Sequence, residues 1–291
     1  MIDDLLLSTV RLSVPVLLAA YGGMLSEKSG VANIALEAHL MFAAFAGAAA
    51  VTLSGSLLVG ILAGLAASAL VGFLFAFACI WGRGDQIVVG TAFNLLAVGL
   101  IPVVNKSLFD VTGSTPSIPN ELTLHEPWMF FVGAVVLLVA LEYLFRKTRH
   151  GLRITAAGEN PLALATMGVN FKMVRLRAVV EGSLLAGLGG IYLSLCQGSG
   201  YIREMSAGRG FIALAALIFG AWRPLQTFLA CLFFAFTDAV QIQLQGKMIA
   251  GYAVPNQFIQ ILPYAATLFV LIFYTRRISA PAAINRDTEI W

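Results

Sequence analysis

Four ionisable side chains lie inside otherwise apolar stretches of this sequence: Arg11, Glu37, Glu181 and Asp238. At the centre of a helix in lipid, such a charge costs about 2.5–3.5 kcal/mol on insertion scales, so each one calls for a partner or a function. The three carboxylates could bind protons or cations, as in a secondary transporter or a channel. They could equally belong to the polar path of a transporter that another protein drives.

Two polar clusters accompany these charges. Asn33 and Glu37 are four residues apart, so a helix containing both would place them on one face. They could line a polar cavity or tie their helix to its neighbours, and the adjacent His39 is expected to pack or to tie helices. In residues 84–94, Phe93 precedes Asn94, and the glycines predict an irregular entry into a helix. An aromatic ring beside an amide could bind a planar heterocycle or a sugar, or Phe93 could simply face lipid or core.

Several other chemistries are excluded. The sequence has no G-x-x-x-x-G-K-[ST] phosphate loop, because its Gly246-Lys247 pair is followed by Met, so we expect no ATP hydrolysis by this chain. No nucleophile–base pair or metal-ligand spacing is visible, which argues against an intramembrane enzyme. The histidines and cysteines are scattered, and the cysteines lie in apolar runs as small core residues: His39, His125, His150, Cys79, Cys196 and Cys231.

The elements that hold these residues must be membrane helices. Of the 291 residues, 59% are hydrophobic and 11% are charged, whereas soluble domains have roughly 45–50% apolar and about 25% charged residues. We therefore expect one all-α transmembrane domain over residues 1–291, a helix bundle with about 8–10 membrane segments. Runs of spanning length occur at 5–25, 31–53, 57–81, 86–104, 127–145, 176–197, 224–243 and 257–275. A shorter run at 209–221 is either a short span or a broken half-helix.

The basic residues predict the orientation. With the N-terminus outside and one crossing per segment, the inside loops hold thirteen Lys and Arg residues and the outside holds four: Lys106, Arg203, Arg209 and Lys247. Residues 105–126 then form an extracytoplasmic loop, residues 146–177 a cytoplasmic loop, and the C-terminus is cytoplasmic. Met1 to Asp4 lack the basic region of a secretory signal, so we expect the first run to remain as a helix. A weak echo between Gly22-Gly23 and Gly189-Gly190 is compatible with an inverted repeat.

The cytoplasmic loop contains a short predicted helix. Asn160 can cap it, Pro161 suits its first position and Gly168 suits the residue beyond its end. The apolar stretch 162–167 between them makes about two turns and is too short to span a membrane. It must bury its face against its own bundle, against lipid headgroups or in a partner protein.

Three stretches together resemble a known family. They are LLAAYGGMLSEKSGVANIALE at 17–37, HGLRITAAGENPLALATMGVNFKMVRLRAVV at 150–180, and GRGFIALAALIFGAWRPL at 208–225, followed by TDAVQ at 237–241. The chain is similar, almost from end to end, to the membrane permease subunits of the branched-chain amino acid, ribose and nucleoside ABC importers. It looks most like the shorter nucleoside-type permease.

The resemblance implies a location and a set of partners. The chain would lie in a bacterial cytoplasmic (inner) membrane, paired with a second related permease chain or a second copy. A cytoplasmic ABC ATPase subunit would bind and hydrolyse the ATP, and this chain would carry no cofactor. An extracytoplasmic solute-binding protein would deliver nucleosides or related small polar solutes, with simple sugars, riboflavin-like compounds or amino acids as alternatives. The lipid bilayer is the remaining contact, and no nucleic acid is implied.

The resemblance also implies site residues. The helix at 161–167 becomes the coupling helix that docks on the ATPase, with these residues at the contact: Glu159, Asn160, Pro161, Leu162, Leu164 and Gly168. The translocation path would be flanked by Asn33, Glu37, Phe93 and Asn94. The chain departs from the family in having Ala38 and His39 after Glu37, where a glycine normally follows the glutamate. It also has Glu181 where a small polar residue is usual, which leaves the substrate open.

Overall fold

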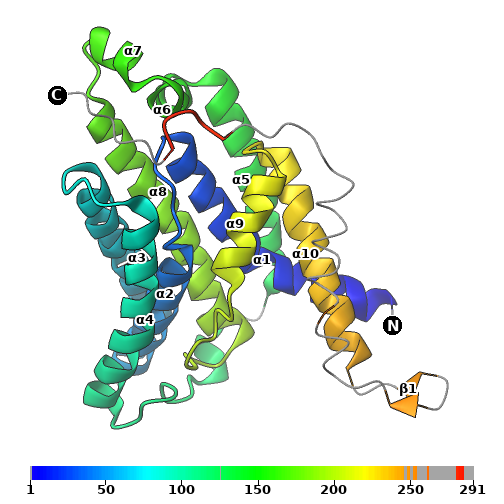
Figure 1. Ribbon diagram of the computed structural model, residues 1–291. Coiled ribbons are helices and arrows are strands. Elements are labelled where there is room, and N and C mark those ends of the chain that lie inside the picture. Colours follow the sequence, from blue (N-terminus) through cyan, green and yellow to red (C-terminus); the bar gives the residue numbers. More distant parts are fainter. Residues whose placement is uncertain are drawn as a thin grey trace.

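The computed structural model describes residues 2–124, 126–245, 248–249, 252–253, 261 and 280–284 as a bundle of helices (Figure 1). Its longer helices are α1 (Ile2–Lys28), α2 (Leu36–Ser54), α3 (Leu57–Ile80), α4 (Gln86–Phe109), α5 (Pro127–Lys147), α8 (Phe171–Tyr192) and α10 (Pro224–Leu244). Its shorter helices are α6 (Arg149–Glu159), α7 (Pro161–Thr166) and α9 (Arg209–Phe219), with a 3₁₀ turn at Asn120–Leu122 and a π turn at Leu193–Gln197. A small antiparallel hairpin pairs β1 (Met248–Ile249) with β2 (Tyr252–Ala253).

Seven of the described helices are long and apolar enough to cross a membrane, which confirms the predicted all-α membrane bundle. The short run at 209–221 forms α9, a helix of 11 residues. At 1.5 Å per residue it is about 16 Å long, roughly half of a hydrocarbon core about 30 Å thick, so it is a half-helix. The predicted run at 257–275 lies outside the described residues except for residue 261.

Local sequence signals explain several helix boundaries. The Asp85 carboxylate accepts hydrogen bonds from the backbone nitrogens of Ile87 and Val88 at 2.9 and 3.0 Å, and this N-cap starts α4. The predicted irregular entry into this helix is therefore wrong, because α4 is continuous from Gln86. Gly55 ends α2 with a φ of 66°, a conformation that glycine adopts without strain.

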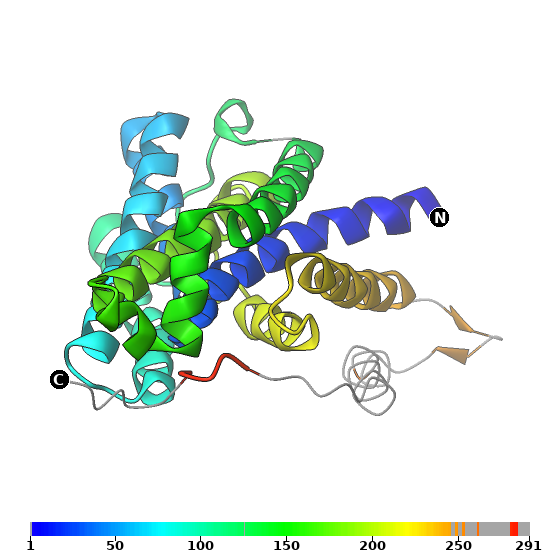
Figure 2. The same ribbon diagram turned by 90° about the horizontal axis from the view of Figure 1, so that it is seen from above.

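The centre of the bundle consists of α1, α2 and α8. More than half of the residues in their most apolar windows are buried, against a third or fewer in α3, α4, α5 and α10. Helices α1 and α8 cross at Gly22 and Gly182, where a Cβ added to Gly22 would lie 2.2 Å from the Gly182 carbonyl oxygen. Glycine is required there because the two backbones touch. Seen from above, α3 and α4 lie on one side of this centre and α9 and α10 on the other (Figure 2).

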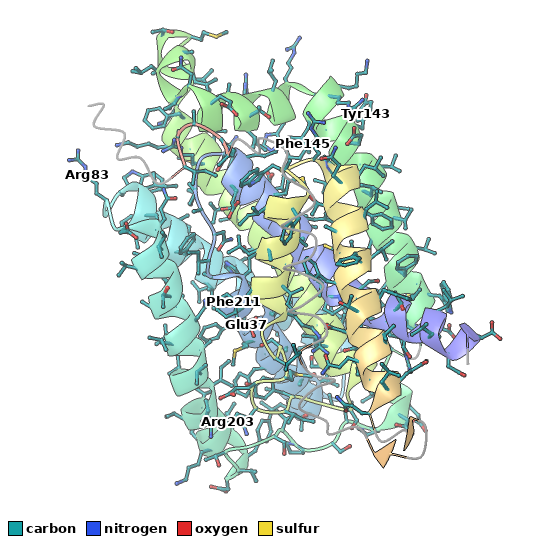
Figure 3. The ribbon with its side chains drawn as sticks, turned by 45° about the vertical axis from the view of Figure 1, so that its right-hand side comes forward. Glu37, Arg83, Tyr143, Phe145, Arg203 and Phe211 are labelled. Carbon is teal, nitrogen blue, oxygen red and sulfur yellow. The ribbon has the colours of Figure 1, made fainter. Side chains whose placement is uncertain are left out.

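The two ends of the bundle carry different elements. Helices α6 and α7 lie at one end together with the C-terminal end of α1 (Figure 1). At the other end residues 110–124 pair with residues 195–203, as in the 3.0 Å hydrogen bond from the Thr115 nitrogen to the Tyr201 oxygen. Figure 3 shows Arg83 and Phe145 at the first end and Arg203 at the second. The predicted inside and outside loops thus separate in space, and the direction of insertion stays a prediction.

Candidate functional site

The chain between α1 and α2 breaks the helical path inside the bundle. Residues 29–35 are not helical, and Asn33 lies in this segment rather than in α2, which begins at Leu36. The prediction that Asn33 and Glu37 share one helical face is therefore wrong. The helix starts late because the freed backbone groups of the break find side-chain partners on α4.

Two amides on one face of α4 hold this break. The side-chain oxygen of Gln86 accepts a 2.6 Å hydrogen bond from the Ala32 nitrogen. Eight residues along, Asn94 accepts from the Ala38 nitrogen and donates to the Ile34 oxygen, both at 2.9 Å. Residues 86 and 94 lie on the same side of a helix, so both amides face the break. Sequence reasoning selected Asn94 but not Gln86, although their spacing was visible.

Glu37 connects α2 to the half-helix α9. Its Oε1 atom accepts hydrogen bonds from the Ser206 hydroxyl at 2.5 Å and the Gly208 nitrogen at 2.8 Å, and its Oε2 atom accepts from the Gly210 nitrogen at 2.7 Å. The carboxylate is nearly buried and lies at the N-terminal end of α9, where the helix dipole favours negative charge. Figure 3 shows Glu37 close to Phe211 in the middle of the bundle.

The structure places the other two predicted path residues differently. The Phe93 ring packs edge to face on the buried Phe75, with the ring centroids 6.2 Å apart, and so belongs to the packing between α3 and α4. Asn33 is fully buried, and neither side-chain polar atom has a hydrogen-bond partner within the described part of the chain. A buried polar group without a partner costs about 1–3 kcal/mol. Asn33 thus lies one residue before the Ile34 oxygen that Asn94 binds, and Glu37 lies in the first turn of α2; their part in a solute path stays a prediction.

The loop between α5 and α8 forms two helices, of which sequence reasoning anticipated only α7. The Asn160 side chain caps α7 by accepting from the Ala163 nitrogen at 3.2 Å, and Pro161 occupies the first position. Gly168 lies beyond the end of α7 with a φ of 75°. These boundaries confirm the predicted helix. Glu159 is the last residue of the unpredicted α6.

Helix α7 has one buried face and one open face. Pro161 and Leu164 are buried against the bundle. Leu162 is 46% exposed and Met167 is 77% exposed, and Leu152 on α6 is 67% exposed. Exposed apolar side chains grouped on two adjacent short helices are typical of a protein interaction surface.

Three other ionisable residues that the sequence singled out, Glu181, His39 and Asp238, make no side-chain hydrogen bond to the break among the described residues. The Glu181 carboxylate lies 2.9 Å from the His150 Nε2 atom, at a groove of about 700 Å³ beside α6 and α8. His39 is fully buried, and neither ring nitrogen has a partner among the residues that the structure describes. Asp238 on α10 lies close enough to Arg209 to interact with it electrostatically. No cluster suited to a metal ion occurs in the described ranges.

Comparison with known proteins gives a consistent result over most of the chain. The family described as "Branched-chain amino acid transport system / permease component" matches residues 5–271. A guanosine ABC transporter permease protein of Bacillus subtilis is 32% identical over 95% of this chain and 93% of its own length. A nucleoside ABC transporter permease protein of Lactococcus lactis is 31% identical over 93% of this chain and 92% of its own. A putative glucose ABC transporter permease protein of Haloferax volcanii is 28% identical over 98% of this chain and 98% of its own.

Proposed function

We propose that this chain, which belongs to the family of branched-chain amino acid transport system permease components, carries nucleosides across a bacterial cytoplasmic membrane. Membership of this family makes the chain the permease subunit of an ABC importer, a transport subunit and not an enzyme. The proposal goes beyond this family role by naming nucleosides as the substrate, and one observation supports that choice. Two relatives named for guanosine and nucleosides align with more than nine-tenths of this chain at 31–32% identity.

Glucose is the second candidate substrate. A relative from Haloferax volcanii that is named as a putative glucose permease aligns with 98% of this chain at a lower identity of 28%. The polar groups at the break are amides and a carboxylate, which can hydrogen-bond the ribose and base of a nucleoside or the hydroxyls of a sugar. The ranking therefore rests on the relatives, and a transport assay must separate the two solutes.

The partners follow from the energy source and the exposed surfaces. With no phosphate loop in this sequence, ATP hydrolysis belongs to a separate ATPase, which would dock on the open face of α7 around Leu162 and Met167. A solute-binding protein would meet the opposite end, where residues 110–124 and 195–203 pair. A second permease chain, related or identical, would complete the pathway. The excess of Lys and Arg in the loops on the α7 side supports a cytoplasmic position for that side.

The break between α1 and α2 is the part of the fold that we assign to the solute path. Discontinuous helices in transporters place backbone and side-chain polar groups where a solute passes. Here the break carries Asn33, whose buried amide has no partner among the described residues, one residue before the Ile34 oxygen that Asn94 binds. An amide that is unpaired in one conformation is available to bind a polar solute in another.

Reconstitution tests this function directly. The chain would be assembled in proteoliposomes with an ATPase, a second permease and a binding protein of the same importer, and uptake of labelled guanosine and glucose would be measured. We expect ATP-dependent guanosine uptake that excess unlabelled glucose does not reduce. Glucose uptake without guanosine uptake would show that the substrate is glucose and not a nucleoside. Gradient-driven uptake by this chain alone would instead indicate a self-sufficient secondary transporter or channel.

A further inference from the structure

Arg175, near the start of α8, connects two segments that are far apart in the sequence. It is only 5% exposed, and its Nε atom donates to the Ser29 oxygen at 3.0 Å while its Nη2 atom donates to the Ala157 oxygen at 3.1 Å. Ser29 begins the break between α1 and α2, and Ala157 belongs to α6. The guanidinium also lies over the Phe171 ring, 5.5 Å from its centroid.

No carboxylate pairs with this buried cation in the part of the chain that the structure describes. Burying a charge is unfavourable, and here the compensation comes from backbone carbonyls and an aromatic face. A guanidinium presents several N–H donors in a rigid planar fork, so it can join two carbonyls in a defined geometry. The side chain therefore acts as a clamp between the two segments.

Backbone contacts make the same junction tight. A Cβ added to Gly158 would lie 2.2 Å from the Lys28 oxygen, so the end of α6 touches the end of α1 directly. Gly30 has a φ of 92°, and a Cβ there would lie 2.9 Å from the Arg175 Nη2 atom. With no side chain between the two segments, a displacement of α6 must move residues 28–30 or break the Arg175 hydrogen bonds.

The junction continues in both directions. Beyond Gly158, the next residues are Glu159 and Asn160, which caps α7. On the other side, Gln86 and Asn94 hold the break to α4, and Glu37 holds the start of α2 to α9. An unbroken series of packed backbone and hydrogen bonds thus joins the exposed helix α7 to the polar break.

We propose that Arg175 is a positioning residue that makes the loop helices α6 and α7 move together with the break between α1 and α2. This inference rests on the proposed transport function, in which α7 receives the movement of an ATPase. Arg175 then passes that movement to the segment that contains Asn33. It touches neither ATP nor solute.

A matched pair of variants tests the coupling in the assembled importer. Arg177 lies two residues further along α8, is exposed and lines the groove beside α6 rather than the break. We expect Arg175→Gln to assemble and hydrolyse ATP but to lower guanosine uptake per ATP by about tenfold, a change typical of a lost coupling interaction. Arg175→Lys keeps the charge without the planar fork, so its guanosine uptake per ATP should lie between those of Arg175→Gln and wild type. Arg177→Gln should behave like wild type. An unchanged ratio of guanosine uptake to ATP hydrolysis in both Arg175 variants would overturn the proposal.

A second measurement does not depend on transport. With Cys79, Cys196 and Cys231 replaced, spin labels at the exposed positions Leu152 on α6 and Val88 on α4 report the distance across the junction. We expect Arg175→Gln and, to a smaller extent, Arg175→Lys to broaden this distribution, and Arg177→Gln to leave it unchanged. If the Arg175 variants broaden the distance distribution but the importer transports neither guanosine nor glucose, the proposed function is rejected and the clamp by Arg175 is supported. An unaltered distribution in Arg175→Lys and in any folded Arg175→Gln would reject the clamp.

Discussion

The Glu37 carboxylate lies 2.7 Å from the backbone nitrogen of Gly210, so a charge on α2 fixes the first turn of the half-helix α9. The approach is so close that a Cβ added to Gly210 would lie 2.4 Å from the Glu37 nitrogen. Half-helix ends leave backbone N–H groups unpaired, and in lipid these groups need a partner inside the protein. Glu37 supplies that partner, which explains a carboxylate at this depth.

Removing the Glu37 carboxylate should destabilise the protein. Glu37→Leu leaves the Gly208 and Gly210 N–H groups and the Ser206 hydroxyl without their acceptor, and each buried unpaired group costs about 1–3 kcal/mol. We expect a clearly lower midpoint of thermal unfolding in detergent, and a smaller loss for Glu37→Gln, which keeps one oxygen. Glu204→Gln, at a half-exposed side chain, is the control. Equal stability of Glu37→Leu and wild type would contradict the anchoring role.

The Asn94 amide should be needed to hold the break. Asn94→Leu removes the partners of the Ala38 nitrogen and the Ile34 oxygen, so we expect stability to fall by about 2 kcal/mol or more. Thr91→Val is a matched control on α4, because Thr91 is exposed and bonds only within its own helix. Denaturant unfolding in mixed micelles would measure both. A loss no larger than that of the control would show that the break does not depend on Asn94.

Replacing Asn33 should change the stability of the protein and its transport activity in opposite directions. Asn33→Leu removes a buried amide that lacks partners in the described structure and replaces it with an apolar side chain of similar size. We therefore expect the unfolding temperature to stay the same or to rise, while guanosine uptake by the assembled importer falls. Undiminished uptake would remove Asn33 from the solute path.

The crossing of α1 and α8 should tolerate no side chain. Gly182→Ala places a Cβ 2.3 Å from the Gly22 oxygen, so the two backbones must separate, and overpacking of this kind costs about 1–3 kcal/mol or more. Gly99→Ala is the contrasting variant, since nothing lies within 4 Å of a Cβ there. That exchange should stabilise α4 slightly, because alanine has the higher helix propensity. Similar unfolding midpoints for the two variants would argue against the close crossing.

Substitutions on the two faces of α7 should have different effects, one on ATPase coupling and the other on folding. Met167→Ser changes a side chain that is 77% exposed, so we expect normal folding but weaker binding and stimulation of the ATPase. Leu164→Ser changes a buried contact with the bundle and should lower the stability of the isolated chain. Co-purification and ATPase assays would measure the first effect, and thermal unfolding the second. Full ATPase stimulation in a double Leu162→Ser, Met167→Ser variant would show that the ATPase docks elsewhere.

Hydropathy and local signals determined much of this protein from the sequence alone. Backbone groups in lipid must be paired inside the protein, and a helix pairs them within one segment, so a long apolar run favours a helix wherever its neighbours lie. The boundaries of α7 are equally local, because Asn160, Pro161 and Gly168 act within one or two turns. Such features need no knowledge of the partners of a helix.

Only the tertiary structure decided what the polar residues do. Asn33 and Glu37 have helical spacing, yet α2 begins after Asn33 because Gln86 and Asn94, more than fifty residues away, pair with the backbone of the break. The carboxylate of Glu37 and the guanidinium of Arg175 likewise meet partners that no sequence spacing indicates. A hydrogen bond between distant segments depends on how the helices pack, and that packing is a property of the whole bundle.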